Sequence, residues 1–350
     1  MKKPFFSIII PTFNRVRELE IAVKCIVSQK YKNFEIIIVD NSSTGKTGRL
    51  VKQFKDKRIR LYVNHRNLGW IKSLKRGLEL AEGEYVILQG DDDYMVLDIA
   101  LKNLRKTIKK YSPGYIRLNY LSYLTWKNQL VDFKLNKKNN INKRIFPNSS
   151  TQDVLEFIEE TDPFFIAGIV FKNKYPKSSK IINSELCPWL MILFYNTSTF
   201  GGYFSSNYSY ISSWQRKVSN SGHPFFRLER NEFTFESYFK VIKKIAKRDA
   251  DRFMKQRLKQ VILLFPANKQ ATNNSNLVKC ARRVLRLSPD FKFSPVFWLS
   301  FIFAYIFPNI ILELIREIFF KRMIHEAEKN RYVFNKNYDF LQSIKTQQIR

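Results

Sequence analysis

Residues 85–95 read YVILQGDDDYM, an apolar run that passes directly into three adjacent aspartates, Asp91, Asp92 and Asp93. Adjacent carboxylates repel one another, so such a triplet is favoured where a cation binds or where a turn is fully solvated. The chain has 350 residues and a formal net charge of +31, so three consecutive negative charges run against its composition. The position of the triplet in the fold, which the surrounding sequence predicts, distinguishes a cation site from a solvated turn.

The segments around this run alternate strand and helix patterns. Such alternation predicts an α/β fold with a mostly parallel sheet and helices on both of its faces. The unbroken hydrophobicity of the strand runs agrees, because central parallel strands are buried on both sides. Strands are predicted at 5–10, 34–40, 58–64 and 84–89, and helices at 16–29 and 70–81.

Polar side chains follow three of the predicted strands. Ligands of open α/β sheets bind beyond the carboxyl ends of the strands. A solvated turn explains any one of these polar ends equally well, but three together favour a single ligand site. The three ends carry Thr12 and Asn14, residues 40–43, and Asp91 to Asp93.

Composition narrows the class of protein. Hydrophobic residues make up 45% and aromatic residues 15%, which excludes a disordered chain. Lys and Arg number 61 against 30 Asp and Glu, a balance that favours an anionic partner such as nucleic acid, a phosphorylated ligand or an acidic membrane surface. The three cysteines and three histidines are dispersed, which predicts free thiols and no zinc site. The apolar run at 5–10 is too short for a signal peptide and ends at Pro11, so we expect a cytoplasmic protein.

The middle of the chain has weaker patterns. The pattern at 199–213 alternates like a hairpin or a pair of edge strands. Helices are predicted at 98–110, 151–160, 188–195 and within 236–262, a strand at 164–171, and exposed loops at 134–144 and 216–222.

The C-terminal part contains a stretch without charge, from Phe293 to Leu312, which is about the minimum length of a membrane span. Pro is well tolerated at the first position of a helix, so one helix should end near Phe307 and another begin at Pro308. We expect this amphipathic segment to lie in a membrane interface and basic helices to meet anionic headgroups, with a true span or a soluble helical appendage as alternatives. The second helix would place Ile310, Ile311, Leu314, Ile315, Ile318 and Phe319 on one side.

Four segments, in this order and spacing, resemble the family 2 glycosyltransferases, which have the GT-A nucleotide-sugar-binding fold. They are residues 6–15, 35–44, 64–77 and 83–95. The resemblance is strong over 5–100 and loose over 101–220. It implies a GT-A domain at 1–222, with a nucleotide-binding half at 1–100 and an acceptor half at 101–222. A basic helical region at 223–350 would follow, with its membrane-interface segment at 293–323.

The resemblance assigns the nucleotide pocket. Pro11, Thr12 and Asn14 would line the pocket of the base, and Asp40 would accept a hydrogen bond from it. Asn41 stands where the family usually has a second acidic residue, so part of that contact is open.

A second loop would lie against the nucleotide through Asn67 and Gly69. Here Ser73-Leu74-Lys75 replaces the Ala-Arg-Asn that usually follows in the family.

The triple aspartate corresponds to the DXD motif of the family, which binds a divalent metal. A hard cation such as Mg²⁺ or Mn²⁺ bridges the phosphates of the leaving nucleoside diphosphate and stabilises the charge that develops there. One alignment uses Asp91 and Asp93, while the other matches Gly90 to the first aspartate and uses Asp92 and Asp93. Asp93 is a metal ligand in both, and Asp91 and Asp92 otherwise contact the donor.

Related enzymes place a general base ahead of a buried helix roughly a hundred residues later, and Glu185 lies there. Leu186 replaces the usual second acidic residue, and Glu185 is equally well explained as a helix N-terminal glutamate favoured by the helix dipole. Asp162 is an alternative base. Arg216 and Lys217 would close over the diphosphate, or simply form a solvated basic loop.

The resemblance therefore implies an inverting glycosyltransferase that moves a hexosyl or deoxyhexosyl group from a nucleotide-diphosphate sugar to an acceptor hydroxyl. The tail is loosely similar to abequosyltransferase-like enzymes of bacterial surface polysaccharide and O-antigen synthesis. That likeness implies a polyprenyl-diphosphate-linked glycan acceptor and peripheral association with the inner face of the cell membrane.

Three other classes remain open. A sugar-phosphate nucleotidyltransferase has a similar sheet, but the loop after the first strand lacks its glycines. A basic nucleic-acid-binding protein fits the charge, but the chain has no recognised nucleic-acid motif and its acidic strand ends would repel phosphates, so we expect no nucleic acid partner. A catalytically inactive family member fits the departures at Gly90, Asn41 and Leu186.

Overall fold

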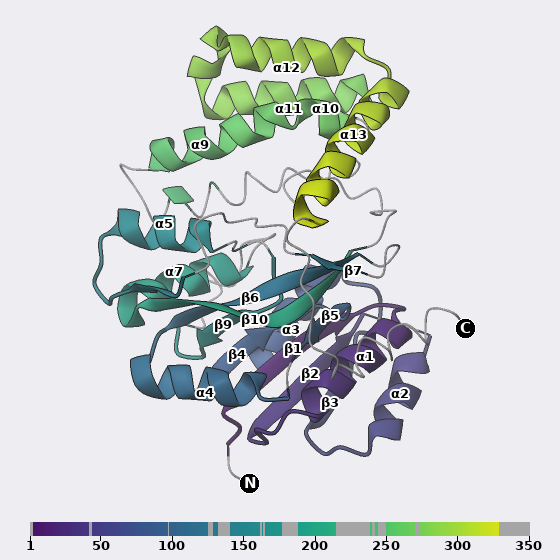
Figure 1. Ribbon diagram of the computed structural model, residues 1–350, viewed down its shortest axis with the longest axis vertical. Coiled ribbons are helices and arrows are strands. Elements are labelled where there is room, and N and C mark those ends of the chain that lie inside the picture. Colours follow the sequence, from purple (N-terminus) through teal and green to yellow (C-terminus); the bar gives the residue numbers. More distant parts are fainter. Residues whose placement is uncertain are drawn as a thin grey trace. The chain divides into compact units, whose positions relative to one another are not determined.

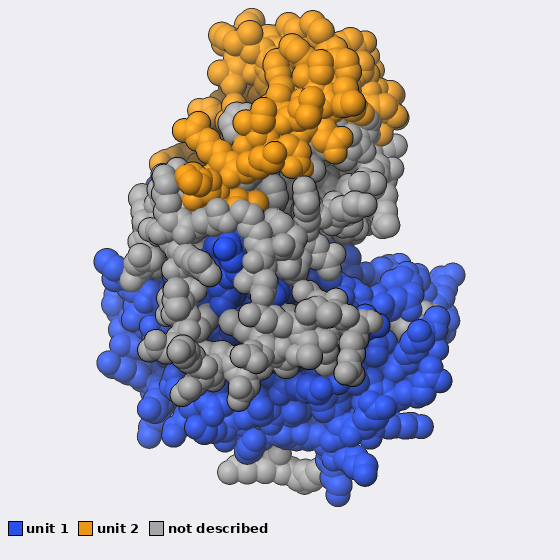
Figure 2. All heavy atoms as spheres, turned by 45° about the vertical axis from the view of Figure 1, so that its right-hand side comes forward, with its two compact units in different colours: residues 1–183, 188–216, 330–350 blue, residues 184–187, 217–329 orange. Residues whose placement is uncertain are grey.

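The computed structural model describes residues 3–41, 44–96, 98–124, 129–131, 141–161, 163, 165–176, 188–214, 239, 242–243, 250–269 and 273–328 (Figure 1). The chain divides into two compact units (Figure 2). Unit 1 comprises residues 1–183, 188–216 and 330–350, and contains the sheet. Unit 2 comprises residues 184–187 and 217–329, and its described elements are helices.

The N-terminal half of the sheet is parallel, as the apolar runs predicted. β1 (Phe6–Thr12) pairs in parallel with β2 (Phe34–Asp40) and with β4 (Tyr85–Leu88), and β2 pairs in parallel with β3 (Ile59–Val63). Every residue of β2 and β4 is buried, because helices cover both faces of these central strands. All four predicted strands are confirmed to within two residues.

The other half of the sheet mixes directions. β9 (Ile169–Lys172) runs antiparallel to both β4 and β6 (Tyr115–Leu124), and β10 (Gly202–Trp214) runs parallel to β6. The short β5 (Asp93–Met95) is antiparallel to β10, which gives the strand order β3-β2-β1-β4-β9-β6-β10-β5. Two further short strands, β7 (Gln129–Val131) and β8 (Lys143–Ile145), pair with β6 and β10. The α/β class with a mostly parallel, mixed sheet is therefore confirmed.

Helices cover both faces of the sheet, and successive side chains of β1 point to opposite faces. Ile8 and Ile10 point to the face that packs with Leu19 of α1 (Val16–Val27), Leu50 of α2 (Lys46–Phe54) and Leu104 of α4 (Ala100–Tyr111). Ile9 points to the other face, where Gly77 of α3 (Trp70–Leu80) lies against it.

Two further helices lie on the α3 face. Trp189 of α7 (Pro188–Phe200) packs on Trp70 of α3 at 5.8 Å between ring centroids. Phe157 of α5 (Thr151–Glu160) meets Tyr115 edge to face at 6.0 Å. α5 begins with a hydrogen bond from the Asp153 amide to the Ser150 hydroxyl, so the chain has an N-cap one residue before the predicted start of this helix.

For the middle of the chain, one prediction is wrong and another is confirmed only in part. Residues 199–213 form neither a hairpin nor a pair of edge strands, because α7 extends to Phe200 and a single strand, β10, follows between β6 and β5. Register shifts between Ser205 and Tyr210 make β10 irregular within this segment. The predicted strand at 164–171 begins only at Ile169, because Gly168 turns the chain with a φ of 78°.

Unit 2 is a small helical assembly with its own apolar core. Phe265 and Phe297 pack edge to face at 5.8 Å, and Leu258, Leu277 and Val284 are buried beside them. Its elements are α9 (Ala250–Leu263), α10 (Phe265–Lys269), α11 (Asn274–Leu287), the 3-10 helix η3 (Pro289–Phe293), α12 (Pro295–Ile306) and α13 (Asn309–Glu328).

The predicted helix break at Pro308 is confirmed, because α12 ends at Ile306 and α13 begins at Asn309. Among the described residues, no single helix is long and apolar enough to cross a membrane. α12 and the segment Asn309–Ile315 reach that length and hydropathy together, but the chain bends by 119° between them.

Candidate active site

The predicted site residues converge where the parallel strands end. Thr12 pairs with Asp40 in the register of β1 and β2, and the Asn41 amide donates to the carbonyl oxygen of Thr12 at 2.9 Å. The hydroxyl of Thr12 donates to Oδ2 of Asp91 at 2.8 Å, across 79 residues of sequence. We call residues 11–15, 40–41 and 90–93 the polar edge.

An arginine that the sequence analysis did not single out holds two of the aspartates. Arg15 precedes the first residue of α1 and donates from one guanidinium nitrogen to Oδ1 of Asp91 at 3.0 Å and from the other to Oδ2 of Asp92 at 2.8 Å. Asn14 just before it is exposed and has a φ of 55°, a left-handed conformation that Asn tolerates better than most residues. Arg15 could have been proposed as a site residue from the sequence, because it belongs to the segment 6–15 that carries part of the family resemblance.

Asp93 has a different environment from its two neighbours. It is 5% exposed, Ser212 of β10 donates a side-chain hydrogen bond to it, and the Gln89 side chain donates to its carbonyl oxygen at 3.1 Å. A Cβ atom on Gly90 would lie 2.4 Å from Oδ2 of Asp93 and 3.1 Å from Oδ1 of Asp92. The two aspartates therefore turn one oxygen each towards Gly90, and a side chain at this position would have to displace the carboxylate of Asp93.

Burial works against ionisation of these carboxyl groups. It raises the pKa of Asp91 to about 7, although the charge of Arg15 and the hydroxyl of Thr12 oppose the shift. Burial and then the charges of Asp92 and Asp91 raise the pKa of Asp93 well above its ordinary value. Burial lowers the pKa of Arg15, but Asp91 and Asp92 outweigh it, so the net shift is upward. The arginine thus stays charged between carboxylates that burial and mutual repulsion destabilise.

A set of side-chain amides shapes the loop before α3. Oδ1 of Asn41 accepts from the Leu68 amide at 2.8 Å and from the Asn64 side chain at 3.2 Å. Nδ2 of Asn41 donates to Oδ1 of Asn67 at 2.6 Å, and that oxygen also accepts from the Gly69 amide at 2.9 Å. Gly69 has a φ of 84°, which favours glycine. Asn41, at the position where an acidic residue was expected, therefore supports the loop that contains Asn67 and Gly69.

The structure also places the remaining predicted residues. Asp40 is buried, and its carbonyl oxygen accepts from the Asn64 amide at 2.8 Å. Pro11 is half-buried beside it. Five predicted residues lie outside the described residues: Glu185, its neighbour Leu186, the alternative base Asp162, Arg216 and Lys217.

The part of the chain that the structure describes contains no group of three or more His, Cys, Asp or Glu residues arranged to hold a metal ion. Carboxylate oxygens are nevertheless the ligands that Mg²⁺ and Mn²⁺ prefer. Two carboxylates already share one cation here, the guanidinium of Arg15. The carboxylate oxygens of Asp91 and Asp92 are therefore suitable ligands for a hard divalent cation once the side chain of Arg15 moves away.

Residues 7–172 match the family model of Glycosyl transferase family 2. That segment contains every residue of the polar edge and the amide set of Asn41, Asn64 and Asn67.

Two curated relatives are similar to this chain over about 120 residues. The first is the GalNAc(5)-diNAcBac-PP-undecaprenol beta-1,3-glucosyltransferase of Campylobacter jejuni, 37% identical over 115 residues, which cover 32% of this chain and 36% of the relative. The second is the UDP-Glc:alpha-D-GlcNAc-diphosphoundecaprenol beta-1,3-glucosyltransferase WfaP of Escherichia coli, 33% identical over 120 residues, 33% of this chain and 48% of the relative. The chain thus spans less than half the length of these relatives.

The fold is similar to that of S. aureus TarS 1-349, whose crystal structure contains UDP-GlcNAc. The two share 15% sequence identity with a TM-score of 0.52, over 82% of this chain and 91% of the other. This likeness establishes a GT-A-like fold and no more.

Proposed function

We propose that the protein is an inverting glycosyltransferase that takes a sugar from a nucleotide-diphosphate sugar. One observation carries the proposal. Three separate parts of the sequence, represented by Thr12, Asp40 and the pair Asp91 and Asp92, meet at the carboxyl ends of β1, β2 and β4 within the segment that matches Glycosyl transferase family 2. Ligands of open α/β sheets bind at such strand ends.

In this proposal the chain's own residues orient the donor. Asp40 and the edge of Pro11, Thr12 and Asn14 hold the base, and the loop of Asn67 and Gly69 lies against the nucleotide. Because Asn41 fixes that loop through three hydrogen bonds, its geometry is set before the donor arrives.

Asp91, Asp92 and Asp93 would hold Mg²⁺ or Mn²⁺. Such a cation, when bound, offsets the negative charge that develops on the departing diphosphate. Thr12 keeps the carboxylate of Asp91 oriented, and Gly90 leaves room for the carboxylate of Asp93.

Glu185 is proposed as the general base. It would take the proton of the acceptor hydroxyl while the hydroxyl oxygen bonds to the anomeric carbon and the bond from that carbon to the diphosphate oxygen breaks. Attack from the side opposite the leaving group inverts the configuration. Arg216 is proposed to contact the departing diphosphate, since a guanidinium binds phosphate in a bidentate manner.

We propose a polyprenyl-diphosphate-linked glycan as the acceptor, in bacterial surface polysaccharide synthesis. The names of both relatives describe an acceptor linked to undecaprenol through a diphosphate. Transfer assays with a panel of nucleotide sugars, among them one that carries an abequose-like deoxyhexose, would identify the sugar that is moved.

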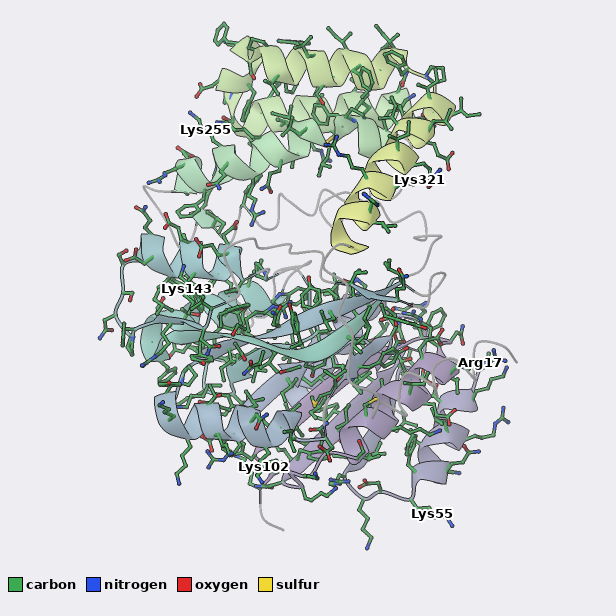
Figure 3. All side chains as sticks on the ribbon, in the orientation of Figure 1. Arg17, Lys55, Lys102, Lys143, Lys255 and Lys321 are labelled. Atoms are coloured by element: carbon green, nitrogen blue, oxygen red, sulfur yellow. The ribbon has the colours of Figure 1, made fainter. Side chains whose placement is uncertain are left out.

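Unit 2 supports association with an anionic membrane surface, where such an acceptor resides. The sequence of residues 250–328, which contains its helices α9 to α13, has thirteen Lys and Arg against six Asp and Glu. Figure 3 shows side chains projecting from the side of α12 turned away from α10 and α11. Large apolar side chains at helical spacing on η3, α12 and α13 are each 47–78% exposed. We call this set the apolar face: Phe293, Val296, Leu299, Ile302, Ile306, Ile310, Leu314 and Ile318.

The sequence pattern of α13 agrees in part with this exposure. Ile310, Leu314 and Ile318 are exposed as predicted, while Ile311 and Ile315 are half-buried and the side chain of Phe319 is not described. So many exposed large apolar side chains along two successive helices favour an interaction surface. An anionic lipid interface would match both these side chains and the basic composition of residues 250–328.

The donor proposal is tested by calorimetry with UDP-, GDP- and dTDP-sugars, with Mn²⁺ and with EDTA. We expect one nucleotide class to bind with Mn²⁺ and to bind more weakly with EDTA. Binding that is equal under both conditions contradicts the metal role. Tight binding to duplex DNA at physiological salt, with no nucleotide sugar bound, favours the nucleic-acid alternative.

The membrane proposal is tested by flotation with anionic vesicles. The protein should float at low salt and less completely at high salt, because salt screens the charges but not the apolar contact. Leu299→Glu combined with Ile310→Glu should abolish flotation, while Val63→Glu, at an exposed apolar site of unit 1, should not. Wild-type protein that never floats contradicts the proposal, and a loss of self-association in the double variant would instead assign the apolar face to a second copy of the chain.

A further inference from the structure

The contact between Arg15 and the aspartates has the geometry of an occupied cation site. Arg15 reaches Asp91 at 3.0 Å and Asp92 at 2.8 Å, with a different guanidinium nitrogen on each carboxylate. Among the described residues, no other Lys or Arg forms an ion pair with either aspartate. One monovalent cation thus lies between two carboxylates, with the carboxylates of Asp93 and Glu18 close enough to act on the same charges.

We infer that Arg15 is an exchangeable counter-ion, which leaves Asp91 and Asp92 when a divalent cation binds there and then contacts the diphosphate of the donor. The inference rests on the proposed function for the identity of the ligand. It makes Arg15 a donor-binding residue that couples the cation to the nucleotide.

Burial and anchoring support an exchange of this kind. The Arg15 side chain is 36% exposed and that of Asp92 is 29% exposed, so the guanidinium can leave towards solvent without breaching the core. The backbone beside it is fixed, since the Leu19 amide donates to the Arg15 carbonyl oxygen at 3.0 Å in the first turn of α1. Asp91 stays in place without Arg15, because Thr12 holds its other oxygen. Only the arginine side chain needs to move.

The charges favour this exchange when the divalent cation and the nucleotide diphosphate are both present. A divalent cation alone must displace a guanidinium that two charge-assisted hydrogen bonds retain. The diphosphate of a nucleotide offers the released guanidinium a new anionic partner of bidentate geometry. Cation and nucleotide should therefore strengthen each other's binding, and the coupling should depend on Arg15.

The alternative is that Arg15 is a permanent structural partner of the aspartates. Removal of its charge would then destabilise the polar edge through repulsion among the carboxylates. In wild type the carboxylates of Asp91 and Asp92 would then accept no divalent cation, with or without nucleotide. Cation binding to wild type in the absence and in the presence of nucleotide therefore separates the two cases.

The experiment compares wild type, Arg15→Gln, Arg15→Lys and the control Arg17→Gln, which removes an exposed arginine two residues away (Figure 3). Mn²⁺ binding is followed by electron paramagnetic resonance of the free ion, first alone and then with UDP, GDP or dTDP. We expect Mn²⁺ alone to bind Arg15→Gln about tenfold or more tightly than wild type or Arg17→Gln, because the competing cation is gone. Nucleotide should strengthen Mn²⁺ binding in wild type and much less in Arg15→Gln.

Equal affinity of Mn²⁺ for wild type and Arg15→Gln, measured without nucleotide, overturns the inference. Arg15→Lys keeps the charge and should resemble wild type in the Mn²⁺ titration, which makes it the control for the charge itself. Arg15→Met, which removes the charge and keeps a side chain of similar length, serves if Arg15→Gln does not fold. If no nucleotide binds wild type with Mn²⁺, the proposed function and the diphosphate contact both fail, and the titration with Mn²⁺ alone still decides whether Arg15 competes with a cation.

Discussion

Asn41→Asp would introduce an acidic residue at a position where family 2 glycosyltransferases usually have one, and we expect it to destabilise this chain. Oδ1 of residue 41 would keep its bonds from Leu68 and Asn64. The nitrogen that donates to Oδ1 of Asn67 at 2.6 Å would become a carboxylate oxygen facing another oxygen. Asn67 cannot turn its amide around at no cost, because the same oxygen accepts from the Gly69 amide.

The size of the effect follows from the burial of residue 41, which is 4% exposed. A buried acceptor left without its donor costs about 1–3 kcal/mol. Since a pKa change of one unit corresponds to 1.36 kcal/mol, this cost raises the pKa of the new carboxyl group in the folded state by roughly one to two units above its ordinary value near 3.9. A protonated carboxyl group can donate to Asn67, so the penalty is absent below about pH 4 and complete above about pH 6.

The assay is thermal unfolding of wild type, Asn41→Asp and the control Asn207→Asp across this pH range. Asn207 is exposed on β10, so its substitution should leave the unfolding temperature almost unchanged. For Asn41→Asp we expect a loss of roughly 2–4 °C per kcal/mol near pH 7 that disappears near pH 4. An Asn41→Asp protein as stable as wild type at pH 7, or one equally destabilised at both pH values, would refute the amide arrangement.

Three further predictions test the polar edge and the proposed chemistry. Gly90→Ala should lose about 1–3 kcal/mol of stability in urea unfolding, because its Cβ would lie 2.4 Å from Asp93, whereas Gly48→Ala, whose Cβ has ordinary contact at 3.9 Å, should be neutral or stabilising. The pKa of Asp91 is about 7 when folded, so the folded state binds more protons than the unfolded state and stability falls as pH rises from about 4 to 7; Asp91→Asn should remove that loss in melts across the same range. Glu185→Gln should lower turnover roughly 10²–10⁴-fold with donor affinity unchanged in calorimetry, and near wild-type turnover would redirect the search for the base.

The parallel half of the fold was predictable because its information is local. Strands buried on both sides of a sheet need continuous apolar runs. The short apolar runs that end at Thr12, Asp40 and Leu88 have this pattern and therefore indicated the central strands. α2 has only two buried residues, Thr47 and Leu50, so it gave too little pattern to be predicted.

The site was predictable in its location but not in its contacts. Parallel strands place their carboxyl ends at one edge, so the meeting of Thr12 with Asp91 followed from the order of elements. The pairing of Arg15 with aspartates 76 and 77 residues away did not, because no periodic pattern encodes it. The role of Asn41 was hidden for the same reason, since its partners belong to a loop 23 to 27 residues further along the chain.

β5, the three-residue strand that begins at Asp93, is held in the sheet by β10, to which Asp93 pairs through Ser212. The aspartate motif thus depends on a strand that lies more than a hundred residues later in the sequence. Contacts that close such a long loop form slowly relative to local contacts. The parallel strands can assemble first, and Asp93 reaches its final position in a late step of folding. A fragment cut at residue 172, where the family match ends, would retain Asp93 yet lack the strand that seats it.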